Sequence, residues 1–177
     1  DLMEVALTFD DGPKRETAEP ILDVLKQRGV QATFFVVGRF AEENPDLIRR
    51  MMAEGHEVGN HTMTHPRLTM LDETGVRDEL ESCEMAVREA TGGVGMHLFR
   101  PPGMQYTESI LRTIQDMGYV TVHWNVVAGD YEPVAPQVVT DRVLRQTVPG
   151  SVILLHLSPD TAKALPVMLD ALTERGY

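Results

Sequence analysis

The sequence predicts an α/β fold in which parallel strands alternate with helices. Short runs of β-branched and aromatic residues alternate with longer segments of helical periodicity, which is the pattern of strands joined by crossover helices. Helical segments that stop at Gly29, Gly55 and Gly118 each lead within three residues into a strand. No Pro- or Ser-rich linker interrupts the 177 residues, so we expect one domain over residues 1–177.

The first half of the chain contains three predicted strands and three predicted helices. Apolar runs predict strands at 5–9, 32–37 and 57–60. Thr17 can cap the first helix, which ends at Gly29, and Asn44-Pro45 supplies a cap followed by proline at the first helical position of the second, which ends at Gly55. The third helix covers about 72–91 and is closed by Gly92-Gly93.

The second half continues the alternation. Strands are predicted at 98–100, 119–122 and 152–155, with helices at about 107–117, 136–148 and from the last strand to 175. Six β/α units result, and they fit either an open doubly wound sheet or a closed barrel. In both folds the loops after the strands' carboxyl ends meet at one edge, so reactive residues are expected there.

Composition narrows the classes of function. Sixteen Lys and Arg against 27 Asp and Glu give a net charge of −11, which argues against nucleic acid or an anionic membrane surface as a partner. No apolar run approaches the roughly 20 residues of a membrane span, and residues 1–4 lack the character of a signal peptide, so we expect a trimmed or mature chain. The single cysteine, Cys83, rules out a cysteine-based zinc site, so a metal would need His and carboxylate ligands.

Two motifs after predicted strands suggest a metal site. Asp10 and Asp11 directly follow the first strand, where adjacent carboxylates repel each other unless a positive group offsets them. His61 and His65 follow the third strand, and two His at this spacing in a helical turn project to the same side. Two imidazoles with Asp11 as third ligand would leave coordination positions open, as in hydrolytic metal sites.

Three more polar residues follow later strands. Arg100, in Arg-Pro-Pro-Gly, could lie against the carboxylate pair in a bidentate fork. His156 ends the last strand and would face the same edge, and Asp130 could orient its ring through one nitrogen.

The order of these motifs resembles the NodB-homology polysaccharide deacetylases, carbohydrate esterase family four. The motifs are Thr-Phe-Asp-Asp-Gly-Pro from residue 8, His-Thr-Met-Thr-His from 61, Arg-Pro-Pro-Gly from 100 and Leu-Leu-His from 154. The resemblance covers nearly the whole chain and implies a distorted (β/α) barrel with fewer than eight strands. It implies one catalytic domain over 1–177, a carbohydrate partner, a monomer, and an extracellular or cell-envelope location.

The resemblance also implies residue roles, carried over position by position. Asp10 would be the general base and Arg100 would orient it, while His156 would be the general acid and Asp130 its tether. Asp11, His61 and His65 would hold a divalent metal, most simply Zn²⁺, with Co²⁺ or Ni²⁺ as alternatives. The Gly103 amide would donate to the oxyanion, and Leu154 would shape the pocket for the acetyl methyl.

The chain departs from the family pattern in two motifs, and this affects the expected substrate. Gly103 stands where the family usually has an aromatic residue, and Val127 and Tyr131 stand where it usually has Asp and Trp. The expected reaction is removal of N-acetyl groups from a GlcNAc-containing polymer, such as chitin, a chito-oligosaccharide or peptidoglycan. O-deacetylation of xylan and a non-catalytic carbohydrate-binding relic are the alternatives. The acidic surface favours a neutral or partly deacetylated glycan.

Overall fold

The structure is a seven-stranded parallel sheet that curls into an incomplete barrel; it is a computed structural model that describes residues 2–177. The strands lie in the order β5-β4-β3-β2-β1-β7-β6, with parallel pairing throughout. Their bounds are β1 Ala6–Asp10, β2 Thr33–Val36, β3 Glu57–Asn60, β4 Leu98–Phe99, β5 Val120–Thr121, β6 Val126–Val127 and β7 Val152–His156. The α/β fold class and the distorted barrel are therefore confirmed.

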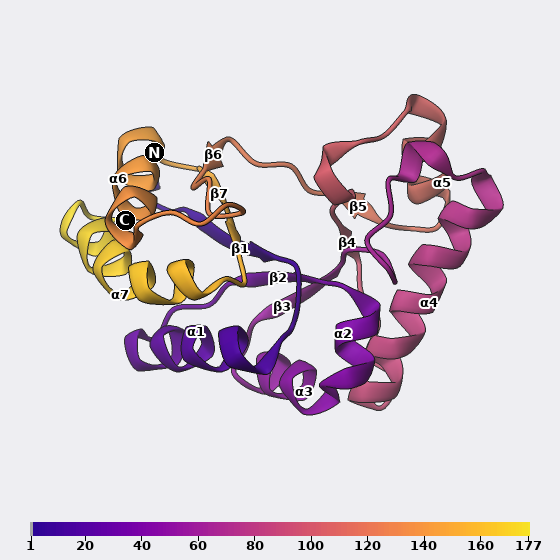
Figure 1. Ribbon diagram of the computed structural model, residues 1–177, viewed down its shortest axis with the longest axis horizontal. Helices are drawn as coiled ribbons and strands as arrows, with labels where there is room; N and C mark the ends of the chain where they lie inside the picture. The colour runs from indigo at the N-terminus through magenta and orange to yellow at the C-terminus, as the bar shows by residue number, and fades with distance from the viewer. Residues whose placement is uncertain (1) are drawn as a thin grey trace.

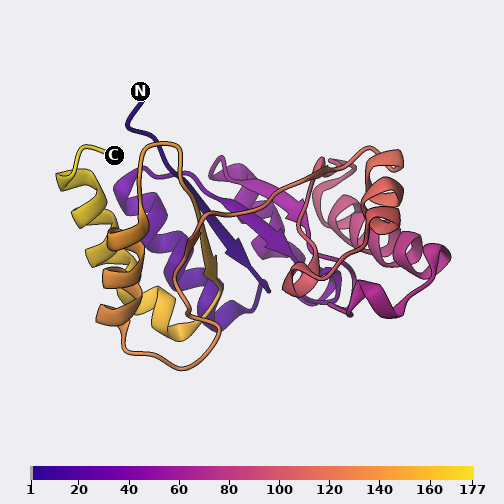
Figure 2. The ribbon, with the colours of Figure 1, turned by 90° about the horizontal axis from the view of Figure 1, so that it is seen from above.

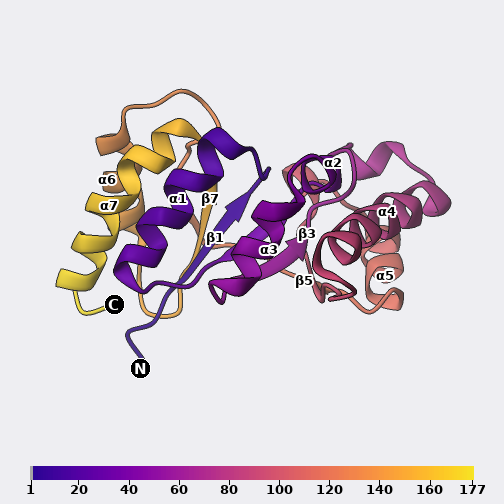
Figure 3. The ribbon, with the colours of Figure 1, turned by 90° about the horizontal axis from the view of Figure 1, so that it is seen from below.

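Within residues 2–177, seven α-helices and two short 3₁₀ helices surround this sheet on most sides. They are α1 Arg15–Arg28, α2 Gly38–Glu43, α3 Pro45–Ala53, α4 Glu73–Thr91, α5 Glu108–Asp116, α6 Pro136–Gln146 and α7 Pro159–Glu174, with η1 Leu68–Met70 and η2 Pro102–Met104. Figure 1 shows α6 and α7 on the left, α1 and α3 below and α4 and α5 on the right. From below, α1, α3 and α7 lie in front of the strands (Figure 3), and from above the segment from β5 to β6 crosses them (Figure 2).

The two faces of the sheet have different roles. On β1, Leu7 and Phe9 are buried in the hydrophobic core, whereas Thr8 and Asp10 alternate with them and point to the opposite face. On β7, Ile153 and Leu155 belong to the core. The strand period of two therefore brings Leu154 and His156 to the same face as Asp10, inside the curl.

Two elements of the structure differ from the six predicted units. Strand β6 has two residues, too few for a period-two pattern, and helix α2 has six, less than two turns. Both elements depend on tertiary pairing: Val127 of β6 lies beside Leu154 of β7, and α2 packs on α4. The prediction of six strands was wrong by one for this reason.

No helix among the described residues is long and apolar enough to cross a bilayer.

Candidate active site

The carboxyl ends of β1, β3, β4 and β7 bring the predicted site residues to one edge of the sheet. Asp10 is the last residue of β1 and His156 the last of β7, and the two are register partners in neighbouring strands. His61 directly follows β3, and Arg100 directly follows β4. The site therefore lies where the loops of a parallel sheet converge, as the sequence predicted.

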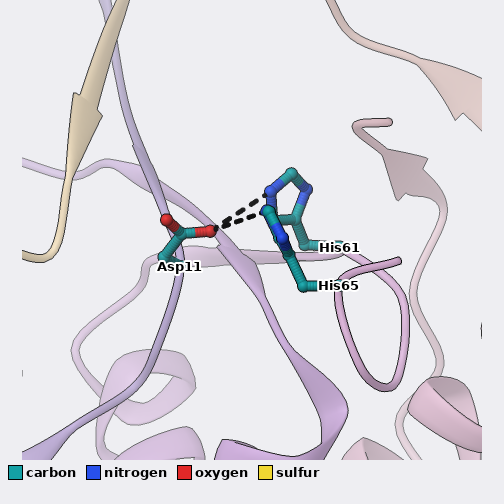
Figure 4. Close-up of side chains that lie close together, drawn as sticks. All are labelled: Asp11, His61 and His65. Carbon is teal, nitrogen blue, oxygen red and sulfur yellow. Dashed lines mark ion pairs between the residues drawn. The ribbon is translucent and has the colours of Figure 1, made fainter. Parts of the chain in front are cut away.

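Asp11, His61 and His65 form a compact cluster at this edge (Figure 4). Asp11 Oδ1 lies 3.4 Å from His61 Nε2 and 3.2 Å from His65 Nε2. The three atoms all lie within 4.8 Å of one another. Tetrahedral zinc ligands with bonds of about 2.0–2.1 Å lie about 3.3–3.4 Å apart, so the two measured separations suit such an ion.

The chemistry of these three atoms also fits a cation. His61 Nδ1 lies 2.7 Å from the Arg100 carbonyl oxygen, which only accepts, so Nδ1 donates to it and Nε2 is the ring nitrogen that faces Asp11. Asp11 Oδ1 is buried and has no hydrogen-bond partner among the described residues. Burial opposes ionisation of Asp11, but the neighbouring imidazoles outweigh it and hold the pKa of Asp11 below its ordinary value. The contact with Asp11 raises the pKa of His65 despite burial.

The two histidines lie in a loop, so the prediction that they share a helical turn was wrong. Thr62 and His65 have φ of 69° and 62°, which is the left-handed region. The Asn60 side chain accepts from the Thr62 amide at 2.8 Å, and Thr62 Oγ1 accepts from the His65 amide at 3.0 Å. These bonds turn the loop so that both rings face Asp11.

Backbone strain is concentrated in the loops of this edge. Among residues 2–177, the non-glycine residues with positive φ are Asp11, Thr62, His65 and Met104. Asp11 and His65 belong to the Asp–His cluster, and Thr62 lies between its two histidines. Met104 follows Gly103. Such conformations cost on the order of 1–3 kcal/mol each and persist where the surroundings fix them, as functional sites do.

Asp10 is buried against Arg100, which is itself fully buried. Arg100 Nη1 donates to Asp10 Oδ1 at 2.7 Å and to Thr8 Oγ1 at 2.8 Å. The predicted bidentate fork was wrong, because Nε and Nη2 donate instead to the carbonyls of Val122 and His123, at 3.2 and 3.3 Å. Burial lowers the pKa of Arg100, although Asp10 opposes the shift.

The guanidinium of Arg100 also lies close to two aromatic rings. Its Cζ lies 4.2 Å from the Phe35 ring centroid and 5.3 Å from that of Trp124. With its N–H groups donating to four different residues, the guanidinium has little freedom to move, and it fixes the position of the Asp10 carboxylate.

His156 is held by Asp130 through two hydrogen bonds. Asp130 Oδ1 lies 2.9 Å from His156 Nδ1, and Oδ2 accepts from the His156 backbone amide at 2.7 Å. Thr161 Oγ1 donates to the same carboxylate. Burial acts to lower the pKa of His156, but Asp130, with the charges of Asp10 and Asp11, outweighs it and the pKa is raised. The geometry leaves Nε2 free to exchange a proton.

A pocket of about 280 Å³ opens beside these groups. Its lining residues are Asp11, Gly12, Lys14, Val37, Arg39, Phe40, His65, Asp130, Tyr131, His156, Leu157 and Ser158. Tyr131 is 67% exposed, and its ring centroid lies 6.0 Å from that of His156. Leu154 is buried on β7 and Gly103 is exposed in η2; neither lines this pocket.

Several supporting residues escaped the sequence reasoning. Thr8 contacts Arg100, and period-two spacing from Asp10 could have placed it on the same face. Asn60, Thr62 and Thr161 act through hydrogen bonds that no motif indicates.

Comparison with known sequences identifies relatives along almost the whole chain. The polysaccharide deacetylase family model matches residues 3–122. A chitooligosaccharide deacetylase of Sinorhizobium fredii is 38% identical over 98% of this chain and 87% of its own length. A peptidoglycan-N-acetylglucosamine deacetylase of Bacillus cereus is 40% identical over 88% of this chain and 56% of its own length. A peptidoglycan-N-acetylmuramic acid deacetylase of Bacillus subtilis is 37% identical over 98% of this chain and 67% of its own length.

Solved structures match the fold closely. The Bc1960 peptidoglycan N-acetylglucosamine deacetylase superposes with a TM-score of 0.95 at 35% identity, covering 99% of this chain and 84% of that one. A family 4 carbohydrate esterase from Streptomyces lividans, in complex with acetate, has a TM-score of 0.91 at 32% identity. The match covers 97% of this chain and 88% of the esterase chain. A CE4 family pseudoenzyme from Bacillus anthracis has a TM-score of 0.94 at 32% identity, and this chain spans 63% of its length.

The fold, the motifs and the comparisons agree. The chain belongs to the polysaccharide deacetylase family, also called carbohydrate esterase family four.

Proposed function

We propose that this chain is a metal-dependent N-deacetylase that hydrolyses the acetamido groups of a GlcNAc-containing polysaccharide. The observation that carries the proposal is the Asp11–His61–His65 cluster, which suits a divalent cation and has Asp10 and His156 beside it. Relatives that deacetylate chito-oligosaccharides and peptidoglycan support an amide substrate.

Asp10 is the proposed general base. A divalent cation held by Asp11, His61 and His65 would polarise the acetyl carbonyl and make the attacking water more acidic. Asp10 takes the proton from this water while the water oxygen bonds to the acetyl carbonyl carbon. Arg100 holds the carboxylate at 2.7 Å and leaves Oδ2, 3.9 Å from His61 Nε2, facing the cluster.

His156 is the proposed general acid. The carbon–nitrogen bond breaks as His156 Nε2 gives its proton to the departing nitrogen, so the products are acetate and a free amine. Asp130 accepts from Nδ1 and raises the pKa of the ring against the effect of burial, which favours the protonated, acid form of His156.

Three further residues are assigned to substrate contacts. We assign the backbone amide of Gly103 to the developing oxyanion, Leu154 to the acetyl methyl and the exposed Tyr131 to the sugar. The assignment of Leu154 is supported by its position two residues before His156, on the same face of β7.

The proposal extends to the cofactor and the setting. Zn²⁺ is the proposed metal because it prefers two imidazoles and one carboxylate with open positions; Co²⁺ and Ni²⁺ suit the same ligands. We further propose one catalytic domain over 1–177, a monomeric state, and action in the cell envelope or outside the cell.

Acetate release tests this function. The protein is stripped with chelator, restored with Zn²⁺ or Co²⁺, and assayed on N-acetylated chito-oligomers and on acetylated xylan. Release from chito-oligomers that disappears on stripping and returns with metal supports the amide deacetylase. Release from xylan alone would replace it with the O-acetyl esterase.

One of the similar structures is that of a pseudoenzyme, so whether this chain is an active enzyme depends on its own catalytic residues. A relic would be expected to have lost the base or the acid, whereas this chain keeps Asp10 and His156 with their partners Arg100 and Asp130. Absence of acetate release from both substrates, with one equivalent of metal bound, would support the relic.

A further inference from the structure

We propose that the wall of the pocket formed by Lys14, Arg39 and Phe40 binds a carboxylate on the glycan, so that the enzyme prefers amino-sugar polymers that carry an acidic substituent. The inference rests on the proposed deacetylase function and adds a substrate class to it.

The three residues share one pocket with the proposed catalytic groups. Lys14, Arg39 and Phe40 line the same pocket as His65 and His156. Lys14 Nζ lies 4.8 Å and Arg39 Cζ 4.6 Å from the centroid of the Phe40 ring. Both positive groups are therefore gathered at one aromatic side chain on the wall of the pocket.

Among the described residues, neither of these two cations has an acidic partner. No ion pair joins Lys14 or Arg39 to a carboxylate within residues 2–177, whereas the adjacent Arg15 pairs with Glu19 and Asp46 at 2.7 and 2.8 Å.

The carboxylates in the pocket lining already have other contacts. Asp11 faces the two histidines and Asp130 holds His156. In a chain of net charge −11, two positive groups beside the candidate active site thus remain available to a ligand.

The backbone fixes this wall relative to the site. The Val37 amide donates to the Gly12 carbonyl at 2.8 Å, and the Arg39 amide donates to the Met63 carbonyl at 3.0 Å. Gly38 packs so closely that an added Cβ would lie 2.9 Å from Cys83 Cα. The start of α2 is thereby held against both the Asp11 loop and the histidine loop.

A carboxylate suits this wall better than a neutral sugar. Lysine and arginine side chains attract a carboxylate through charge-assisted hydrogen bonds. The net negative charge of the whole chain opposes anionic ligands only at long range, and salt screens it beyond about 8–10 Å. Charges inside the pocket act at shorter distances, so they decide the preference.

The test compares oligomers that differ in charge. Acetate release is measured on neutral N-acetylated chito-oligomers, on the same oligomers oxidised to carboxylates at C6, and on GlcNAc oligomers that carry lactyl ether carboxylates. The protein has its metal restored, and assays are run at low and high NaCl. We expect a higher kcat/KM on at least one carboxylated oligomer, falling with salt; which of the two shows it identifies the source of the carboxylate.

Variants assign this preference to the two residues. In Lys14→Gln/Arg39→Gln, the ratio of kcat/KM for the carboxylated to the neutral oligomer should fall about tenfold, as expected from losing two exposed charge pairs. Arg112→Gln, on α5 and outside the pocket lining, removes one positive charge and should leave the ratio unchanged. An unchanged ratio in the double variant would overturn the proposal, because the cations would then serve only to offset Asp11 and Asp130.

A binding measurement separates this proposal from the deacetylase function. Titration calorimetry with the carboxylated oligomer and metal-free protein should give a Kd that rises in the double variant. If the parent protein releases no acetate from any oligomer, the deacetylase function fails, but a Kd that depends on Lys14 and Arg39 would still support the anion site. A Kd independent of both residues would overturn it.

Discussion

Arg100 Nη1 lies 2.7 Å from Asp10 Oδ1, across the inside of the curled sheet and between residues 90 positions apart in the chain. This contact links the carboxyl end of β1 to the loop after β4. Because the Arg100 carbonyl also accepts from His61 Nδ1 at 2.7 Å, one residue orients both the proposed base and a proposed metal ligand.

Replacing Arg100 tests this link through stability. Arg100→Met leaves Asp10 buried without its partner, which typically costs about 3–5 kcal/mol. Urea denaturation at neutral pH should show this loss in the free energy of unfolding. Arg112→Met, in which an exposed arginine is replaced, should change it by less than about 0.5 kcal/mol. Equal stability of the two variants would mean that the buried pair does not contribute as described.

Replacing Asp130 tests the acid. Asp130 is the main group that raises the pKa of His156 against burial, so in Asp130→Asn that pKa falls. If protonated His156 is required, activity is lost as pH rises through its pKa, and the alkaline limb of the pH–rate profile should move to lower pH. The rate above neutral pH should drop by on the order of ten- to a hundredfold. Asp141→Asn, on α6 and outside the pocket, serves as the control, and an alkaline limb that stays in place would contradict the role of Asp130.

Metal binding should stabilise the fold through the three proposed ligands. A ligand at a concentration a thousandfold above its Kd adds about 4 kcal/mol, so Zn²⁺ should raise the Tm of stripped protein by on the order of 10 °C. His65→Ala should abolish most of this shift, whereas His97→Ala, at an exposed histidine before β4, should keep it. A zinc-induced shift that survives in His65→Ala would place the metal elsewhere.

Much of the site could be predicted because parallel strands end at one edge. Asp10, His61, Arg100 and His156 each end or follow a strand, and this placement alone brings them together. The partnership of His156 with Asp130 followed from the same reasoning, and the hydrogen bond is present.

Other features depend on tertiary contacts that leave no pattern in the sequence. The positive φ of Thr62 and His65 is maintained by Asn60 and by the packing of the loop, so a helical turn was the wrong expectation for the histidines. The partners of Arg100 include two backbone carbonyls, which no motif encodes. The net charge of −11 describes the whole chain, so it gave no indication that two cations, Lys14 and Arg39, line the pocket.

The most direct test of the central claim is acetate release from N-acetylated chitotetraose by wild-type protein and by Asp10→Asn, with bound zinc measured on the same samples. Asp10 is the proposed base and not a proposed ligand, so the variant should keep one equivalent of zinc while its kcat falls by about 10²–10⁴-fold. Wild-type protein stripped of zinc should be inactive and should recover when zinc is restored. An Asp10→Asn variant with full zinc and nearly full activity would contradict the account.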